Sequence, residues 1–133
     1  MQKIEHIGIA VEDLEHSNSL FERLLGEAPY KQEEVAAEGV VTSFFRNGPN
    51  KIELVASKSP NGPIARHLEK RGEGIHHIAF SVADIRAEMN RLREQGFQLL
   101  SDQPKEGADN KLVCFVHPKS ANGVLIELCQ EMP

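Results

Sequence analysis

A segment that occurs twice is the feature of this sequence that most restricts its fold. Residues 6–14 read HIGIAVEDL and residues 77–85 read HIAFSVADI, and four of the nine positions are identical. The tripeptide Ile-Glu-Leu also occurs twice, at 52–54 and 126–128. Each copy reads as a strand, a helix and then about three strands, with Gly, Pro and Asn at the turns between them. The sequence therefore predicts two similar halves that pack or pair to form one sheet.

Apolar residues with helical spacing follow each repeated segment. Asp13 and Asp84 are placed to cap these helices at their N-termini, and Gly26 and Gly96 to end them. We expect the first helix to bury a face formed by Leu14, Leu20, Phe21, Leu24 and Leu25. We expect the second helix to bury Ile85, Met89 and Leu92.

The length of 133 residues, of which 40% are hydrophobic, is enough for one compact domain with its own core. We expect an α+β fold in which two tandem βαβββ modules form a curved, cupped mixed sheet. Module one spans 1–57, a helical connector spans 58–74 and module two spans 75–133. Pro63 fits the first turn of the connector helix, and Gly72 can end it.

Composition excludes several classes of function. The net charge of −5 disfavours a broad nucleic-acid-binding surface. No apolar run approaches the roughly 18 residues that span a membrane, and the N-terminal segment lacks the basic and apolar parts of a secretory signal. We therefore expect a cytoplasmic protein with neither membrane nor nucleic-acid partners. Cys114 and Cys129 have no paired spacing and are interpreted as reduced core thiols.

Strand parity distinguishes two adjacent histidines, His76 and His77. Neighbouring side chains of a strand point to opposite faces, so these two imidazoles cannot easily serve one site. In the first repeat, His6 shares its face with the small residues Gly8 and Ala10, while the aliphatic residues between them form the opposite, bulky row. The repeat aligns His77 with His6. The pattern therefore predicts that His77, and not His76, is the functional histidine.

Two glutamates occupy matched positions in the same two repeats. Glu53 and Glu127 each stand between aliphatic residues, so each carboxylate leaves the apolar face of its strand. Taken singly, such a glutamate is usually solvated and such a histidine is usually structural. Because the same pair recurs in both copies, we interpret His6, Glu53, His77 and Glu127 as a mixed nitrogen and oxygen site for a divalent metal.

Longer segments resemble the methylmalonyl-CoA epimerases of the vicinal oxygen chelate (glyoxalase/bleomycin-resistance) superfamily. HIGIAV and IEL are typical of the whole superfamily, whereas PIARHLEKRGEGIHHIAF and HPKSANGVLIEL are similar to the epimerases in particular. The resemblance implies the glyoxalase-like fold, a homodimer and an acyl-CoA substrate. It also implies one divalent metal ion per subunit, held by the residues matching His6, Glu53, His77 and Glu127. Cobalt, nickel, manganese and zinc are not distinguished.

The resemblance further implies a reaction, the interconversion of (R)- and (S)-methylmalonyl-CoA through a metal-stabilised enolate. Glu127 is the first candidate for the base that removes the α-proton, with Glu53 facing it from the other half. Some relatives carry a further carboxylate in the third strand of the first half, where this chain has Thr42, which cannot act as a base. The alternatives are a glyoxalase I-like isomerase, a non-catalytic small-molecule binding protein of the same fold and, last, a dioxygenase.

The loop at 117–123 precedes the strand that carries Glu127 and is therefore expected to border the site. Lys119 or Ser120 could bind the substrate carboxylate or a phosphate there, although a solvated turn is the alternative. Three cationic residues of the connector are expected on a solvated helix face: Arg66, Lys70 and Arg71. Three histidines without a counterpart in the other repeat are expected at the surface: His16, His67 and His117.

Overall fold

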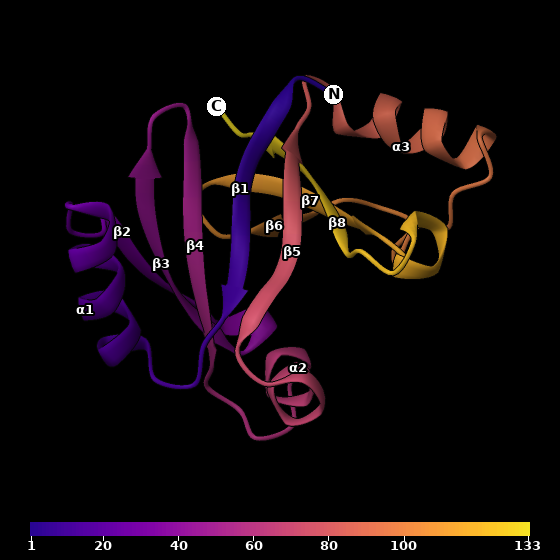
Figure 1. The fold of residues 1–133 in the computed structure, drawn as a ribbon. Helices are drawn as coiled ribbons and strands as arrows, with labels where there is room; N and C mark the ends of the chain where they lie inside the picture. The colour runs from indigo at the N-terminus through magenta and orange to yellow at the C-terminus, as the bar shows by residue number, and fades with distance from the viewer. The chain divides into compact units, whose positions relative to one another are not determined.

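The computed structural model describes residues 1–133 and contains eight strands, three α-helices and two short 3-10 helices (Figure 1). The first half of the chain forms β1 (Lys3–Ala10), α1 (Leu14–Leu25), β2 (Lys31–Val35), η1 (Ala36–Glu38), β3 (Val40–Asn47) and β4 (Asn50–Ser57). After α2 (Pro63–Arg71), the second half forms β5 (Gly74–Ser81), α3 (Ile85–Glu94), β6 (Lys105–Gly107), β7 (Lys111–Val116), η2 (Pro118–Ala121) and β8 (Ile126–Glu131). The strand order is β2-β3-β4-β1-β5-β8-β7-β6 in one mixed sheet. The predicted α+β fold with two βαβββ modules is confirmed.

The chain forms two compact units. One consists of His6–His76, and the other of Met1–Glu5 together with His77–Pro133. The first residues of the chain thus belong with its second half, where the Gln2 N–H donates a hydrogen bond to the Ser81 carbonyl oxygen at 2.8 Å. A short N-terminal segment therefore completes the unit that is built from the C-terminal half.

In the unit His6–His76, α1 packs against one face of the strands. Three of the expected residues, Leu14, Phe21 and Leu25, contact the buried cluster that includes Val11, Phe45, Leu54 and Ala56. Leu20 and Leu24, which we expected on the same face, are 41% and 68% exposed. At about 100° per residue they lie roughly 80–120° around the helix from the packed stripe. That part of the prediction is wrong, because the sheet covers a narrower stripe than the five leucine and phenylalanine positions span.

The second unit repeats this arrangement with α3, whose buried residues are those expected: Ile85, Met89 and Leu92. Cys114 packs in the same cluster, whereas Cys129 packs with Ala79 and Val113. The register of β7 with β8 pairs Cys114 with Leu128 and Cys129 with Val113, so the two cysteines lie on opposite faces of the sheet. Both cysteines are buried and neither forms a disulfide, as predicted.

The two predicted N-caps are present and use the same hydrogen bond. The Asp13 side chain accepts from the His16 backbone N–H, and the Asp84 side chain accepts from the Ala87 N–H, each at 3.1 Å. Gly26 ends α1 with a φ of 82°, a left-handed conformation that glycine adopts without strain. The same local chemistry therefore begins both helices of the repeat.

The connector helix α2 packs on the other face of the strands in the unit His6–His76. It begins at Pro63, as predicted, and its buried Ile64 contacts a cluster formed by Ala10, Val40 and Val55. Ala10 is four residues after His6 in β1, so the two side chains point to the same face of the strand. The connector therefore closes one end of the face that carries His6. No helix of the chain is both long and apolar enough to cross a membrane.

Candidate metal site

The first half of the candidate site is a histidine–glutamate pair on two parallel strands. The register of β1 with β4 pairs Gly8 with Glu53 and His6 with Lys51. His6 Nε2 lies 3.3 Å from Glu53 Oε1, and both residues are buried. Because Gly8 has no side chain, the position beside Glu53 on β1 is open, and the carboxylate can reach along the sheet to His6. The structure therefore brings together the two residues predicted from the first repeat.

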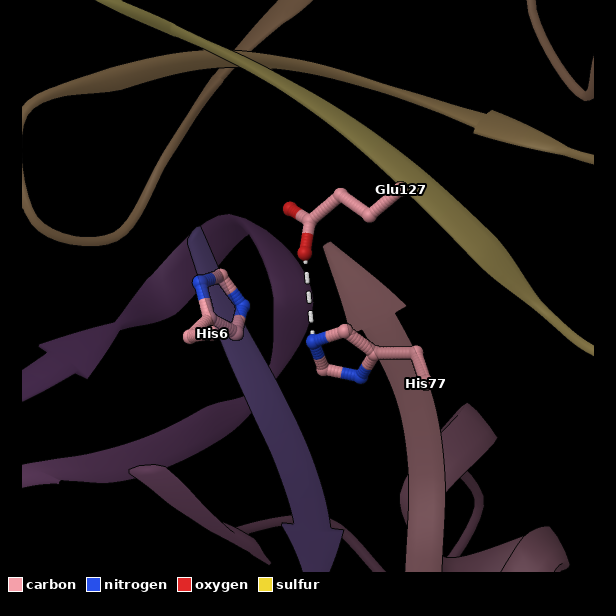
Figure 2. A group of neighbouring side chains, drawn as sticks. All are labelled: His6, His77 and Glu127. Carbon is pink, nitrogen blue, oxygen red and sulfur yellow. Dashed lines mark ion pairs between the residues drawn. The ribbon is translucent and has the colours of Figure 1, made fainter. Parts of the chain in front are cut away.

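The second half of the site has the same construction in the other unit. The register of β5 with β8 pairs the small residue Ala79 with Glu127. His77 Nε2 lies 3.1 Å from Glu127 Oε1, and both residues are buried. Figure 2 shows the two side chains extending toward each other from their strands, joined by the dashed ion pair. A small residue beside each glutamate is thus a shared feature of the two pairs.

Each histidine also has an aromatic neighbour that sequence reasoning missed. The ring of Phe44 lies 6.2 Å from that of His6, and the ring of Phe115 lies 6.0 Å from that of His77, both at 84°. Phe44 is paired with Glu53 across β3 and β4, and Phe115 with Glu127 across β7 and β8. Phe44 and Phe115 are 71 residues apart, the same offset as the two histidines. That offset is the signal that could have identified them.

The donor atoms of each pair suit a divalent cation. Burying a carboxylate is costly unless an opposite charge or a metal ion compensates for the loss of water. Neutral imidazole nitrogens and carboxylate oxygens are ligands that zinc and other divalent first-row metals accept. Each pair thus offers one imidazole nitrogen and one carboxylate of the kind that such ions bind.

His76 has a ring neighbour different from that of His77. Its ring stacks edge-on against that of His67 from α2, with 5.0 Å between the ring centroids. Partial burial, and next the nearby Arg71 guanidinium, lower the pKa of His67. His67 thus lies at the surface, as expected, but is half-buried because the imidazole of His76 partly covers it. His16, by contrast, is exposed as expected.

The loop at 117–123 is ordered by its own hydrogen bonds. His117 Nδ1 accepts from the Lys119 backbone N–H at 3.0 Å, and so His117, expected only at the surface, caps the η2 helix. The Ser120 hydroxyl oxygen accepts from the Gln98 N–H at 3.0 Å. This bond fixes the oxygen of Ser120 and leaves its hydrogen to donate elsewhere. The Lys119 side chain is exposed, as are the connector cations Arg66, Lys70 and Arg71.

The chain is similar to known proteins over almost its whole length. The ethylmalonyl-CoA/methylmalonyl-CoA epimerase of Cereibacter sphaeroides is 41% identical over 130 residues, which are 96% of this chain and 97% of that protein. The methylmalonyl-CoA epimerase of Mycobacterium tuberculosis superposes with a TM-score of 0.94 at 34% identity, covering 98% of this chain and 89% of that one.

A variant of Streptomyces coelicolor methylmalonyl-CoA epimerase, in complex with 2-nitronate-propionyl-CoA, also has the same fold. It superposes with a TM-score of 0.95 at 29% identity, covering 100% of this chain and 99% of that one. Residues 5–115 match the family model described as the Glyoxalase/Bleomycin resistance protein/Dioxygenase superfamily. This chain belongs to the glyoxalase/bleomycin resistance protein/dioxygenase superfamily.

Proposed function

We propose that this chain is a methylmalonyl-CoA epimerase, which interconverts the (R) and (S) forms of its acyl-CoA substrate. One observation carries the proposal: both repeats keep a buried histidine–glutamate pair, in a chain whose similarity to epimerases extends over nearly its full length. A protein that only bound small molecules would have no need for two matched pairs of acid–base and metal-ligating groups.

We infer that one divalent metal ion per subunit is held by His6, Glu53, His77 and Glu127. His6 and Glu53 form a buried pair in one unit and His77 and Glu127 a buried pair in the other, each with the ligand chemistry that a metal ion needs. Two neutral imidazoles and two carboxylates carry two negative charges, which match a divalent cation. When bound, the ion would supply positive charge for the thioester and carboxylate oxygens of the substrate, where negative charge develops. The donors do not choose between cobalt, nickel, manganese and zinc.

The two carboxylates are also the candidates for moving the proton. Epimerisation removes the hydrogen between the thioester and the carboxylate and returns one on the opposite side of the carbon. Glu127 is the first candidate for the base, and Glu53 is the second, because the two stand at matched positions of the two repeats. Burial keeps water away from both groups, which strengthens their electrostatic interaction with the substrate.

Ser120 is the residue of the 117–123 loop best prepared to bind the substrate carboxylate. Its oxygen is held by the Gln98 N–H, so its hydrogen can be donated to an anionic oxygen with little loss of rotational freedom. Lys119, exposed on the same loop, would add a positive charge for the carboxylate or for a phosphate of coenzyme A. A single-domain organisation, a homodimer and a cytoplasmic location stay predictions.

The test is to incubate the metal-loaded protein with methylmalonyl-CoA in D₂O and follow deuterium at the α-carbon. A parallel reaction contains the hemithioacetal of methylglyoxal and glutathione. Exchange and inversion of the acyl-CoA, with no turnover of the hemithioacetal, is the result we expect. The reverse outcome would assign a glyoxalase I-like activity, and stoichiometric binding without turnover of either compound would assign a binding protein.

A further inference from the structure

Thr42, in the middle of β3, carries a buried hydroxyl group without a hydrogen-bond partner. The residue is 1% exposed, and its Oγ1 forms no hydrogen bond with another group of the chain. Native proteins satisfy the large majority of such buried polar atoms, so each exception calls for an explanation. A group that is unpaired within the chain is available to something that binds to it.

The register of the strands puts this hydroxyl on the same face as the first histidine–glutamate pair. Thr42 is paired with Val55 across β3 and β4, and Phe44, two residues on, is paired with Glu53. Directly paired residues share a face, and so do residues two apart on one strand. On this face, the row formed by Thr42 and Val55 is therefore next to the row formed by Phe44 and Glu53. This is also the face where Glu53 contacts His6.

The apolar cluster under α2 includes Val55, the residue paired with Thr42, and extends away from Glu53. Ile64 of α2 packs with Val55, Ala10 and Val40, which are all buried. The polar pair of His6 and Glu53 lies in the other direction along the strands. Thr42 thus stands at the boundary between an apolar cluster, which offers no hydrogen-bond partner, and the proposed site.

The second repeat supplies an internal comparison for this position. Its counterpart is Val113, which is two residues before Phe115 as Thr42 is two residues before Phe44. Val113 is buried and packs in an apolar cluster with Ala79 and Cys129. Valine has nearly the same shape as threonine, so this fold fills the position without a hydroxyl group. Packing alone does not explain why the first repeat has one.

We propose that the Thr42 hydroxyl donates a hydrogen bond to the carboxylate of the bound acyl-CoA and so helps to position it. The inference rests on the proposed epimerase function. A hydroxyl can donate to an anionic oxygen, and such charge-assisted bonds are stronger than those to a neutral carbonyl. Threonine does not ionise near neutral pH, so its role is to bind the substrate and not to remove the proton from carbon.

The test compares the isosteric variant Thr42→Val with Thr42→Ser, which keeps the hydroxyl group. Binding of methylmalonyl-CoA and of propionyl-CoA, which lacks the carboxylate, is measured by calorimetry on the metal-loaded proteins. We expect Thr42→Val to weaken methylmalonyl-CoA binding about tenfold and propionyl-CoA binding less than about twofold, because only the former loses a bond to an anion. Thr42→Ser should bind both within about threefold of the original protein.

Ser43→Ala is the matched control. Ser43 also has a fully buried hydroxyl, but it is the next residue along β3 and points to the α1 face, where it contacts Gln32. Its removal should leave both affinities unchanged. Thermal unfolding of each ligand-free variant is measured as well, and Thr42→Val should melt at or above the original temperature.

Several results would overturn the proposal. Unchanged methylmalonyl-CoA affinity in Thr42→Val would make the hydroxyl a passive core group, and equal weakening for propionyl-CoA would exclude the carboxylate as its partner. A fall in melting temperature without ligand would mean that the hydroxyl binds an internal water. If Thr42→Val does not fold, Thr42→Ala is compared with Thr42→Ser by the same measurements. Failure of the original protein to epimerise the substrate would refute the proposed function itself. The two failures are distinguishable, because the affinities can be measured whether or not the protein turns the substrate over.

Discussion

Substitution of Glu127 by glutamine tests whether this residue acts as a base or only fills space. The side chain is buried and its Oε1 lies 3.1 Å from His77 Nε2. The amide has the same shape and can keep a hydrogen bond to His77, so the fold should survive. What is lost is the negative charge and the capacity to accept a proton from carbon.

The size of the effect follows from the role of the group. A positioned base contributes about 10²–10⁴-fold to a proton transfer, which corresponds to about 3–5 kcal/mol of transition-state stabilisation. The melting temperature of the ligand-free protein should change by only a few degrees, since an isosteric change at one site costs about 1 kcal/mol or less. Activity and stability should therefore respond very differently to Glu127→Gln.

The assay is deuterium exchange at the α-carbon of methylmalonyl-CoA, followed by NMR in D₂O, with metal content measured on the same sample. Glu131→Gln is the matched control, because it removes an exposed carboxylate four residues further along β8. We expect it to exchange at the original rate. Exchange at that rate in Glu127→Gln would refute the assignment of the base. Exchange restored by excess metal would show that Glu127 acts only as a ligand.

Two further predictions concern the histidines and the leucines of α1. His6→Ala and His77→Ala should each purify with less metal by elemental analysis, because each removes a nitrogen donor, whereas His76→Ala should keep its metal; equal content in all three would contradict the parity argument. Leu25→Ala should destabilise the protein by about 2 kcal/mol in urea unfolding, because Leu25 packs on the sheet, while Leu24→Ala should cost less than about 0.5 kcal/mol. Equal losses would mean that α1 buries a wider face than the structure shows.

Much of the fold could be predicted because the duplication supplies two independent readings of each element. The strand, its capping aspartate and the following helix occur in both copies, and both Asp13 and Asp84 form the expected bond. The alternation of side chains along a strand then fixed which residues share a face. His6 and Glu53 do lie together, as do His77 and Glu127, because each pair obeys the same parity.

Other features depend on contacts that a one-dimensional pattern does not contain. The exposure of Leu24 depends on how much of α1 the sheet covers, which hydrophobicity alone does not determine. Phe44 looks like any core phenylalanine until its ring is found against that of His6. The unpaired hydroxyl of Thr42 is likewise visible only when every neighbouring donor and acceptor is known.

The two repeats differ in the length of chain between their matched phenylalanine and glutamate. Phe44 and Glu53 are nine residues apart, whereas their counterparts Phe115 and Glu127 are twelve apart. In the first repeat a tight hairpin joins the two strands, with Asn47 paired to Asn50. In the second, the three additional residues form part of the loop at 117–123, which contains the η2 helix and Ser120. The matched pairs can thus supply similar chemistry from each repeat, while the longer loop adds to the second repeat alone the Ser120 hydroxyl, which we propose as a donor to the substrate carboxylate.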